Sequence, residues 1–134
     1  MQDQFHTFNM FDAQAWYVRD LIVNKASLPT DAEISEDISQ WMAKEEKLED
    51  PLQMIDFQTE YTKDLCSMVD YPEIDMELIR KHFHDWEHHK VDDILQYRNK
   101  SFSSAVTGTV APLHHTNWLD AMDDSMETFM NTKF

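Results

Sequence analysis

A single glycine, Gly108, occurs among the 134 residues of this chain. Average usage would supply roughly nine. Glycines let a backbone turn tightly and approach a pyrophosphate, as in the G-x-G-x-x-G and G-x-x-x-x-G-K-[ST] loops of nucleotide-binding folds. Neither motif can be written with one glycine, so the chain has no recognisable dinucleotide or P-loop cradle of its own.

Composition limits the remaining classes of protein. The length suits one domain, and we treat residues 1–134 as a single unit. A formal net charge of −15 repels phosphate backbones, which argues against nucleic-acid binding. No apolar run approaches the roughly 20 residues of a membrane span. One cysteine cannot form an intrachain disulfide, and with no signal-peptide pattern the expected location is the cytoplasm.

Apolar residues recur at helical spacing along most of the chain, so we predict a mainly α fold with four to five amphipathic helices. The first is expected from Met10 to about Asn24, with Asn9 as its cap and Asp12 in its first turn. The residues that define its apolar face are Phe11, Ala15, Val18 and Ile22.

Capping signals precede the next two helices. Thr30 and Glu33 form an S/T-x-x-E capping box before the second. Asp50 and Pro51 supply the cap and the first helical position of the third. This third helix is expected to stop before Tyr71-Pro72, because the residue before a proline disfavours helical geometry.

The character of the chain changes after the fourth predicted helix. That helix has Asp75 as its cap and continues through Tyr97. Residues near 100–112 are small and β-branched and include Gly108, which predicts one extended segment or loop. A short last helix is expected to begin at Thr116.

The first twenty residues combine aromatic and hydrogen-bonding side chains more densely than an ordinary N-terminus does. Such a mixture suits a buried element that lines a ligand. Gln4 and Thr7 lie just ahead of the first predicted helix, whose N-terminal end offers amide donors and a positive dipole. The simpler interpretation is that they cap a frayed start. The apolar members of this stretch are Phe5, Phe8, Met10, Phe11, Trp16 and Tyr17.

Four histidines gather between residues 82 and 89. His84 and His88 are four residues apart and share a helix face, a spacing that can chelate a metal. No H-E-x-x-H order is present, and structural zinc sites take four convergent ligands, so we assign no metal site. Cys66 lies in an acidic helix without a basic neighbour, which predicts a core residue and not a nucleophile.

Three stretches resemble the bacterial flavin-containing monooxygenases, in particular the trimethylamine monooxygenase group. They are MQDQFHTFNMFDAQAW at residues 1–16, FHDWEHHKVDDILQYR at 83–98 and TGTVAPLHHTNW at 107–118. The resemblance runs from Met1 to about Phe129, and Met1 looks like an internal methionine of the longer family sequence. His6 departs from the family pattern, where an aromatic residue is expected, and Val18 replaces the usual alanine.

The resemblance implies a C-terminal portion of a larger α/β flavoenzyme with two dinucleotide-binding domains, whose glycine-rich fingerprints are absent here. The parent would use NADPH and FAD to N-oxygenate small amines such as trimethylamine, and this chain alone is expected to be inactive. By position, Gln4 and Thr7 are expected to contact FAD near the isoalloxazine. Trp86 is expected near the nicotinamide cofactor, and Arg98 near its phosphate.

An alternative from another class stays open at this point. The chain could be a free-standing acidic helical protein that binds a partner or a metal through the histidines of residues 82–89. The family interpretation also predicts that the aromatic face of residues 5–17 has lost a natural partner. An isolated chain with such a face is expected to self-associate.

Overall fold

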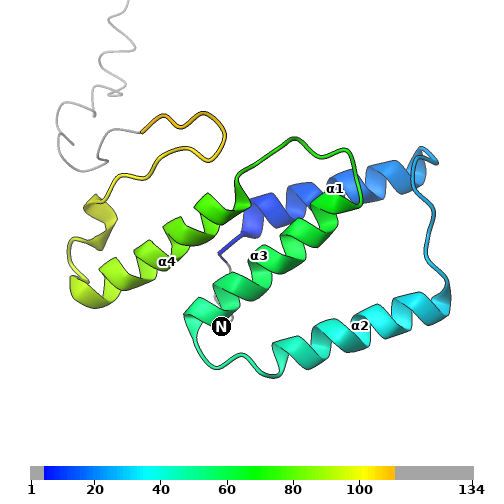
Figure 1. The fold of residues 1–134 in the computed structure, drawn as a ribbon, viewed down its shortest axis with the longest axis horizontal. Coiled ribbons are helices and arrows are strands. Elements are labelled where there is room, and N and C mark those ends of the chain that lie inside the picture. The colour runs from blue at the N-terminus through cyan, green and yellow to red at the C-terminus, as the bar shows by residue number, and fades with distance from the viewer. Residues whose placement is uncertain (1–4, 111–134) are drawn as a thin grey trace, which may run out of the picture.

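A computed structural model describes residues 5–110, and its secondary structure is almost entirely helical (Figure 1). The mainly α prediction is confirmed. None of the helices in this described part is long and apolar enough to cross a membrane. In chain order the elements are α1 (Thr7–Ile22), α2 (Asp31–Glu45), α3 (Pro51–Ser67), α4 (Met76–Asp92) and the 3-10 helix η1 (Tyr97–Asn99).

The third helix, α3, is the centre of the fold. It packs against α1 and against α4, and η1 packs on α4, whereas α2 meets α3 through fewer contacts (Figure 1). Few apolar side chains are buried between these helices, so the core is narrow and follows α3. The buried apolar side chains of the described residues are Ala13, Ile55, Leu65, Met76 and Tyr97.

The predicted starts of α2, α3 and α4 are confirmed. At α2 the Glu33 amide donates to Thr30 Oγ1 over 3.3 Å, and the Thr30 amide donates to Glu33 Oε2 over 2.8 Å. Asp50 and Asp75 each accept a hydrogen bond of 2.9 Å from the amide three residues further on. These caps involve neighbours in sequence, which is why the sequence alone predicts them.

The start of α1 was predicted wrongly. The helix begins at Thr7, one turn before Met10, and His6 occupies the cap position assigned to Asn9. Asp12 consequently lies beyond the first turn. The physical reason is distant in sequence: Gln58 on α3 accepts hydrogen bonds from the amides of residues 5 and 6 and fixes the chain where the helix begins.

The fourth helix is shorter than predicted. It ends at Asp92, and Tyr97 belongs to η1 instead. The Asp93 carboxylate accepts hydrogen bonds from the amides of Leu95 and Gln96 at 3.0 and 3.1 Å, which stabilises a turn in place of further helix.

The segment near 100–112 is a loop closed on itself, described here as far as residue 110. Ser103 and Val110 form an isolated antiparallel bridge, and the Ser104 amide donates to the Thr109 carbonyl over 2.7 Å. Gly108 has a φ of +71°, a left-handed conformation that other residues resist. The helix predicted from Thr116 lies outside the described residues.

Candidate functional site

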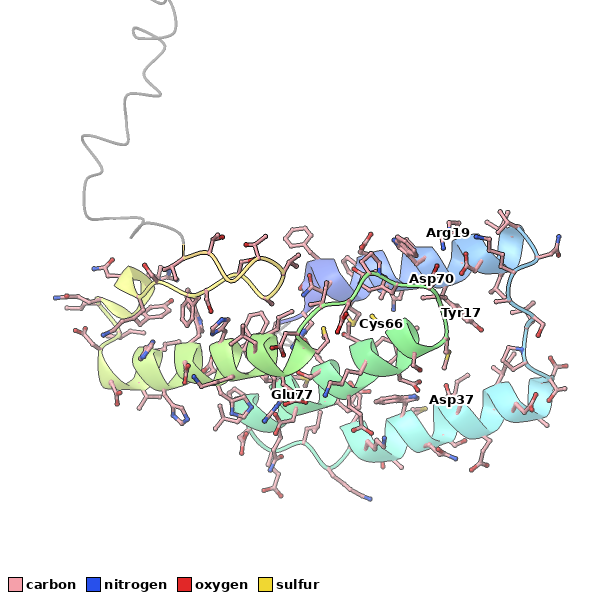
Figure 2. All side chains as sticks on the ribbon, turned by 45° about the horizontal axis from the view of Figure 1, so that its top comes forward. Tyr17, Arg19, Asp37, Cys66, Asp70 and Glu77 are labelled. Atoms are coloured by element: carbon pink, nitrogen blue, oxygen red, sulfur yellow. The ribbon has the colours of Figure 1, made fainter. Side chains whose placement is uncertain are left out.

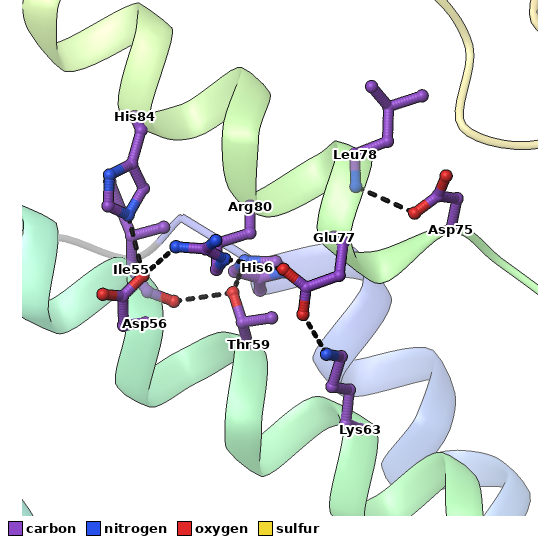
Figure 3. Close-up of polar contacts among 10 residues, drawn as sticks. All are labelled: His6, Ile55, Asp56, Thr59, Lys63, Asp75, Glu77, Leu78, Arg80 and His84. Carbon is purple, nitrogen blue, oxygen red and sulfur yellow. Dashed lines mark hydrogen bonds and ion pairs between the residues drawn. The ribbon is translucent and has the colours of Figure 1, made fainter.

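The segment ahead of α1 is fixed to α3 by hydrogen bonds from both backbone and side chain. The Gln58 Oε1 atom accepts from the amides of Phe5 and His6 at 2.9 and 3.1 Å. The His6 ring also reaches Thr59, with 3.0 Å between Nε2 and Oγ1 (Figure 3). Two neighbouring residues of α3 therefore determine where α1 begins, and sequence reasoning identified neither of them.

The buried ring of His6 has a defined protonation state. The residue is 1 % exposed, and desolvation lowers its pKa from 6.5 to about 4. The hydroxyl of Thr59 donates its one proton to the Ile55 carbonyl over 2.7 Å, so its oxygen accepts from His6 Nε2. The ring is thus neutral with its proton on Nε2, and its buried Nδ1 atom has no hydrogen-bond partner among residues 5–110.

Thr7 occupies the first position of α1 and is half-buried. His6 makes no side-chain capping hydrogen bond in the described structure. A helix start of this kind presents amide donors and the positive end of the helix dipole, a combination suited to an electron-rich ligand edge. Gln4, the other predicted contact in this segment, lies outside the described residues.

The anchored segment rests on the side of α4. The Phe83 ring packs against Phe5 at a centroid distance of 5.6 Å and against His6 at 5.0 Å. Trp86 lies three residues beyond Phe83 on the same helix, so the two rings are neighbours on its surface. The start of α1 and the predicted Trp86 contact therefore lie along one flank of α4.

Trp86 and Arg98 meet through a third residue. Trp86 packs edge-on against the buried Tyr97 at 4.8 Å, and the Arg98 guanidinium lies 4.4 Å from the centroid of the same ring. Trp86 also approaches Phe102 at 6.4 Å, which makes it a member of an aromatic cluster as well as a candidate contact. Arg98 is exposed, as a residue that meets a charged ligand must be.

The histidines of α4 point to different partners. His82 Nε2 lies 2.9 Å from the Ser103 carbonyl, and His84 Nε2 lies 2.7 Å from Asp56. His89 faces the Phe102 ring at 6.3 Å. Within residues 5–110 no group of three or more His, Cys, Asp or Glu side chains could hold a metal ion. The metal-binding alternative has no geometric support in this part of the chain.

Charged side chains tie α3 to α4 (Figure 3). Arg80 donates to Glu77 over 2.9 Å and to Asp56 over 3.1 Å. Glu77 also accepts from Lys63, and the hydrogen bonds from Lys63 and Arg80 lower the pKa of the Glu77 carboxyl. The network is exposed and holds two helices in register, which is a structural role.

A groove of about 720 Å³ opens between α1, α2 and α3. Tyr17 of α1 and Asp37 of α2 line this groove from opposite helices (Figure 2). Sequence reasoning did not identify this groove, because the spacing within a helix does not show how far apart two helices lie. Its apolar lining includes Val18, Leu28, Ile34, Trp41, Leu65 and Met68.

Cys66 is unsuited to nucleophilic chemistry, as predicted. It is half-buried, and desolvation followed by the nearby Asp12 charge raises the pKa of its thiol. A raised pKa reduces the thiolate fraction at neutral pH, which is the reactive form. Asp12, and not the neighbouring Asp64 seen in the sequence, is the carboxylate that acts on it.

Two of three comparisons with known proteins match the helices around α3 to a segment of larger proteins. No family model matches the chain. The trimethylamine monooxygenase of Pelagibacter sp. (strain HTCC7211) is 69 % identical over 133 residues, which are 99 % of this chain and 30 % of that protein. The trimethylamine monooxygenase of Methylocella silvestris is 50 % identical over 131 residues, with shares of 98 % and 29 %.

A solved structure matches the same family of proteins. The crystal structure of Tmm from Pelagibacter sp. strain HTCC7211 matches with a TM-score of 0.83 and 70 % identity, over 96 % of this chain and 29 % of that chain. The chain therefore corresponds, over nearly all its length, to a segment of the trimethylamine monooxygenases. It spans about 30 % of the length of the relatives that it matches. The resemblance stated from the sequence is confirmed.

Proposed function

We propose that this chain is the C-terminal part of an NADPH- and FAD-dependent monooxygenase that N-oxygenates small amines such as trimethylamine. The observation that carries the proposal is the 69 % identity to a trimethylamine monooxygenase over 99 % of the chain. The two glycine-rich nucleotide-binding folds belong to the rest of the enzyme, since one glycine cannot build them. The chain alone does not turn over.

The residues of this chain fit one edge of a flavin and not its phosphates. Bound FAD and NADPH would supply the redox chemistry, and the protein orients them and excludes water. The start of α1 presents the positive end of the helix dipole at Thr7, and Gln58 holds this start in place. Gln4 and Thr7 are the proposed flavin contacts.

Trp86 and Arg98 are the proposed contacts to the nicotinamide cofactor. Both contact the ring of Tyr97, which brings the indole and the guanidinium near each other. A guanidinium forms charge-assisted hydrogen bonds to phosphate oxygens, and Arg98 is exposed enough to do so.

The test compares the isolated chain with the full-length enzyme that contains it. Only the full-length protein should bind FAD and oxidise NADPH in response to trimethylamine. In that protein Arg98→Gln should raise the KM for NADPH about fivefold with kcat unchanged, since an exposed charge contact is worth about 1 kcal/mol. The exposed neighbour Lys100 provides the control variant Lys100→Gln. If the two variants changed the KM for NADPH equally, Arg98 would not be a contact of the nicotinamide cofactor.

Thr7→Val in the full-length enzyme tests the flavin contact. It should weaken FAD retention after gel filtration, whereas Thr107→Val, at an exposed loop position, should not. Unchanged FAD content in both variants would contradict the assignment of Thr7.

Two further properties belong to the same proposal. We place the enzyme in the cytoplasm, which the single cysteine supports. We also propose that the isolated chain self-associates through the N-terminal aromatic face, where Phe8 is 87 % exposed.

A further inference from the structure

One face of α1 is apolar and largely exposed in the described part of the chain. We call it the outer stripe. Phe8 is 87 % exposed and Ile22 74 %, while Phe11 and Val18 are about half exposed. Their spacing of three, four and seven residues places them on one side of the helix. The outer stripe comprises Phe8, Phe11, Ala15, Val18 and Ile22.

The outer stripe is separate from the face by which α1 packs on α3. Ala13 and Asp20 are the buried residues of the helix, and they lie on the opposite side. The helix therefore has two contact faces, of which residues 5–110 cover one. A helix with buried residues on one side and an apolar stripe on the other is typical of one enclosed on both sides by protein.

Charges at the margin of the outer stripe are already engaged within the chain. Asp12 accepts a hydrogen bond of 2.6 Å from the Tyr71 hydroxyl. Arg19 pairs with Asp20 at 2.7 Å and lies 3.9 Å from the centroid of the Trp16 ring. In a chain of net charge −15, this surface can be covered without burying an isolated charge.

The comparisons indicate what covers it. The chain matches 99 % of its own length but 30 % of the Pelagibacter relative, so most of that relative's polypeptide lies outside the matched segment. At 70 % identity and a TM-score of 0.83, the segment keeps its backbone arrangement in the longer protein. A covalently connected partner acts at high effective concentration and so competes well against separate molecules.

We infer that the outer stripe of α1 is the docking surface for the part of the same enzyme that lies outside this chain, which meets it with an apolar face. The inference rests on the proposed function, because it requires the longer polypeptide. It adds a specific prediction: Phe8 and Phe11 are buried in the full-length enzyme although they are exposed here.

Hydroxyl-radical footprinting of the unmodified full-length enzyme measures this burial directly. The oxidation rate of each side chain, divided by its rate in the denatured enzyme, is read by mass spectrometry. Leu95, 88 % exposed on the turn after α4, is the control. Phe8 and Phe11 should be protected several-fold more than Leu95, and dilution of the enzyme should leave that protection unchanged.

Two results would overturn the inference. Phe8 and Phe11 as reactive as Leu95 would show that nothing covers the outer stripe. Protection that disappears on dilution to the monomer would show that a second copy covers it. The enzyme used must first oxidise NADPH in response to an amine. Absence of that activity counts against the proposed function, whereas an unprotected outer stripe in an active enzyme counts against docking alone.

Substitutions provide a second measurement that does not depend on footprinting. Phe11→Lys and Ile22→Lys should each lower the unfolding temperature of the full-length enzyme and increase its dye binding. Leu95→Lys should do neither. Equal unfolding temperatures for the three variants would overturn the inference.

Discussion

His6 shows how a single residue fixes the position of a helix. Its ring is enclosed between α3 and Phe83, and it remains neutral because burial disfavours the imidazolium. The neutral form donates from Nε2 to Thr59, while the backbone of the same residue donates to Gln58. The side chain and the main chain of one residue thus hold the start of α1 together.

The lowered pKa of His6 predicts a loss of stability in mild acid. In the unfolded chain the imidazole binds a proton below pH 6.5, but in the folded chain it does so only near pH 4. The unfolded state therefore binds more protons between these values, and the free energy of unfolding falls as the pH is lowered through that window. The contribution of the neutral His6 ring to the free energy of unfolding is fully present above pH 6.5.

Thermal unfolding of wild type and His6→Gln across this range checks the prediction. The stability advantage of the wild type should shrink as the pH falls from 7 to 4. His88→Gln, at an exposed position of α4, is the control and should follow the wild-type curve. If the difference in stability between wild type and His6→Gln stayed constant with pH, the lowered pKa of His6 would be contradicted.

Asp12 predicts a change in the reactivity of Cys66. Its charge adds to desolvation in raising the pKa of the thiol. Asp12→Asn removes that charge, so the pKa should fall and alkylation by iodoacetamide at pH 8 should become faster. Asp64→Asn is the control, because Asp64 does not contribute to the shift. Equal alkylation rates in the two variants would contradict the role of Asp12.

Residues whose partners are close in sequence were predictable, and residues with distant partners were not. Thr30, Asp50 and Asp75 cap helices through amides three positions away, so their roles follow from local chemistry. Gln58 meets residues 5 and 6, more than fifty positions earlier, and nothing in the local pattern shows that contact. This is why the start of α1 was misplaced by one turn.

At the scale of elements, α2 is the least integrated helix. It buries none of its residues, and it is held to α3 chiefly through Trp41. The indole packs edge-on against Phe57 at 5.4 Å and Tyr61 at 5.2 Å, and Lys44 pairs with Glu60 at 2.5 Å. Aromatic pairs of this kind are each worth about 0.5–1.5 kcal/mol beyond their burial.

Trp41→Ala should therefore release α2 while leaving α3 and α4 in place. The amides of α2 should exchange with solvent nearly as fast as in an unfolded peptide, because its capping box alone supplies only about 1 kcal/mol. Hydrogen exchange followed by mass spectrometry measures this by segment. Met42→Ala is the matched control, since Met42 is 55 % exposed. Unchanged protection of α2 in Trp41→Ala would show that other contacts hold it.

Helical periodicity correctly identified α1 as amphipathic but did not show which protein surface its apolar face meets. Phe11, Val18 and Ile22 recur at helical spacing, yet about half or more of each stays exposed, and Val18 borders the groove between α1, α2 and α3. The face toward α3 carries Ala13 and Asp20, which a search for large apolar residues passes over. The hydrophobic spacing of a helix reflects every surface that buries it in the longer protein. The structure of a segment contains only those surfaces that belong to the segment.

At the scale of the whole molecule, the resemblance to a family predicted more about function than the composition did. The acidic charge and single glycine excluded nucleotide cradles and nucleic acid, but they pointed to no chemistry. The motif-rich ends of the chain identified the family. Residues 1–4 of one end and 111–118 of the other lie outside the described residues.

The last prediction concerns the isolated chain as a whole. A narrow core along α3 and an uncovered outer stripe leave much apolar surface in water, and patches above a few hundred Å² favour association. We expect the purified chain to bind a hydrophobic dye and to form larger species as its concentration rises, measured by light scattering. Val18→Glu should reduce both effects, because it places a charge in the middle of the outer stripe. Val91→Glu, on the exposed end of α4, should leave them unchanged. A chain that stays monomeric, binds no dye and unfolds in one sharp transition would contradict the prediction, since α1 would then have no face in need of a partner.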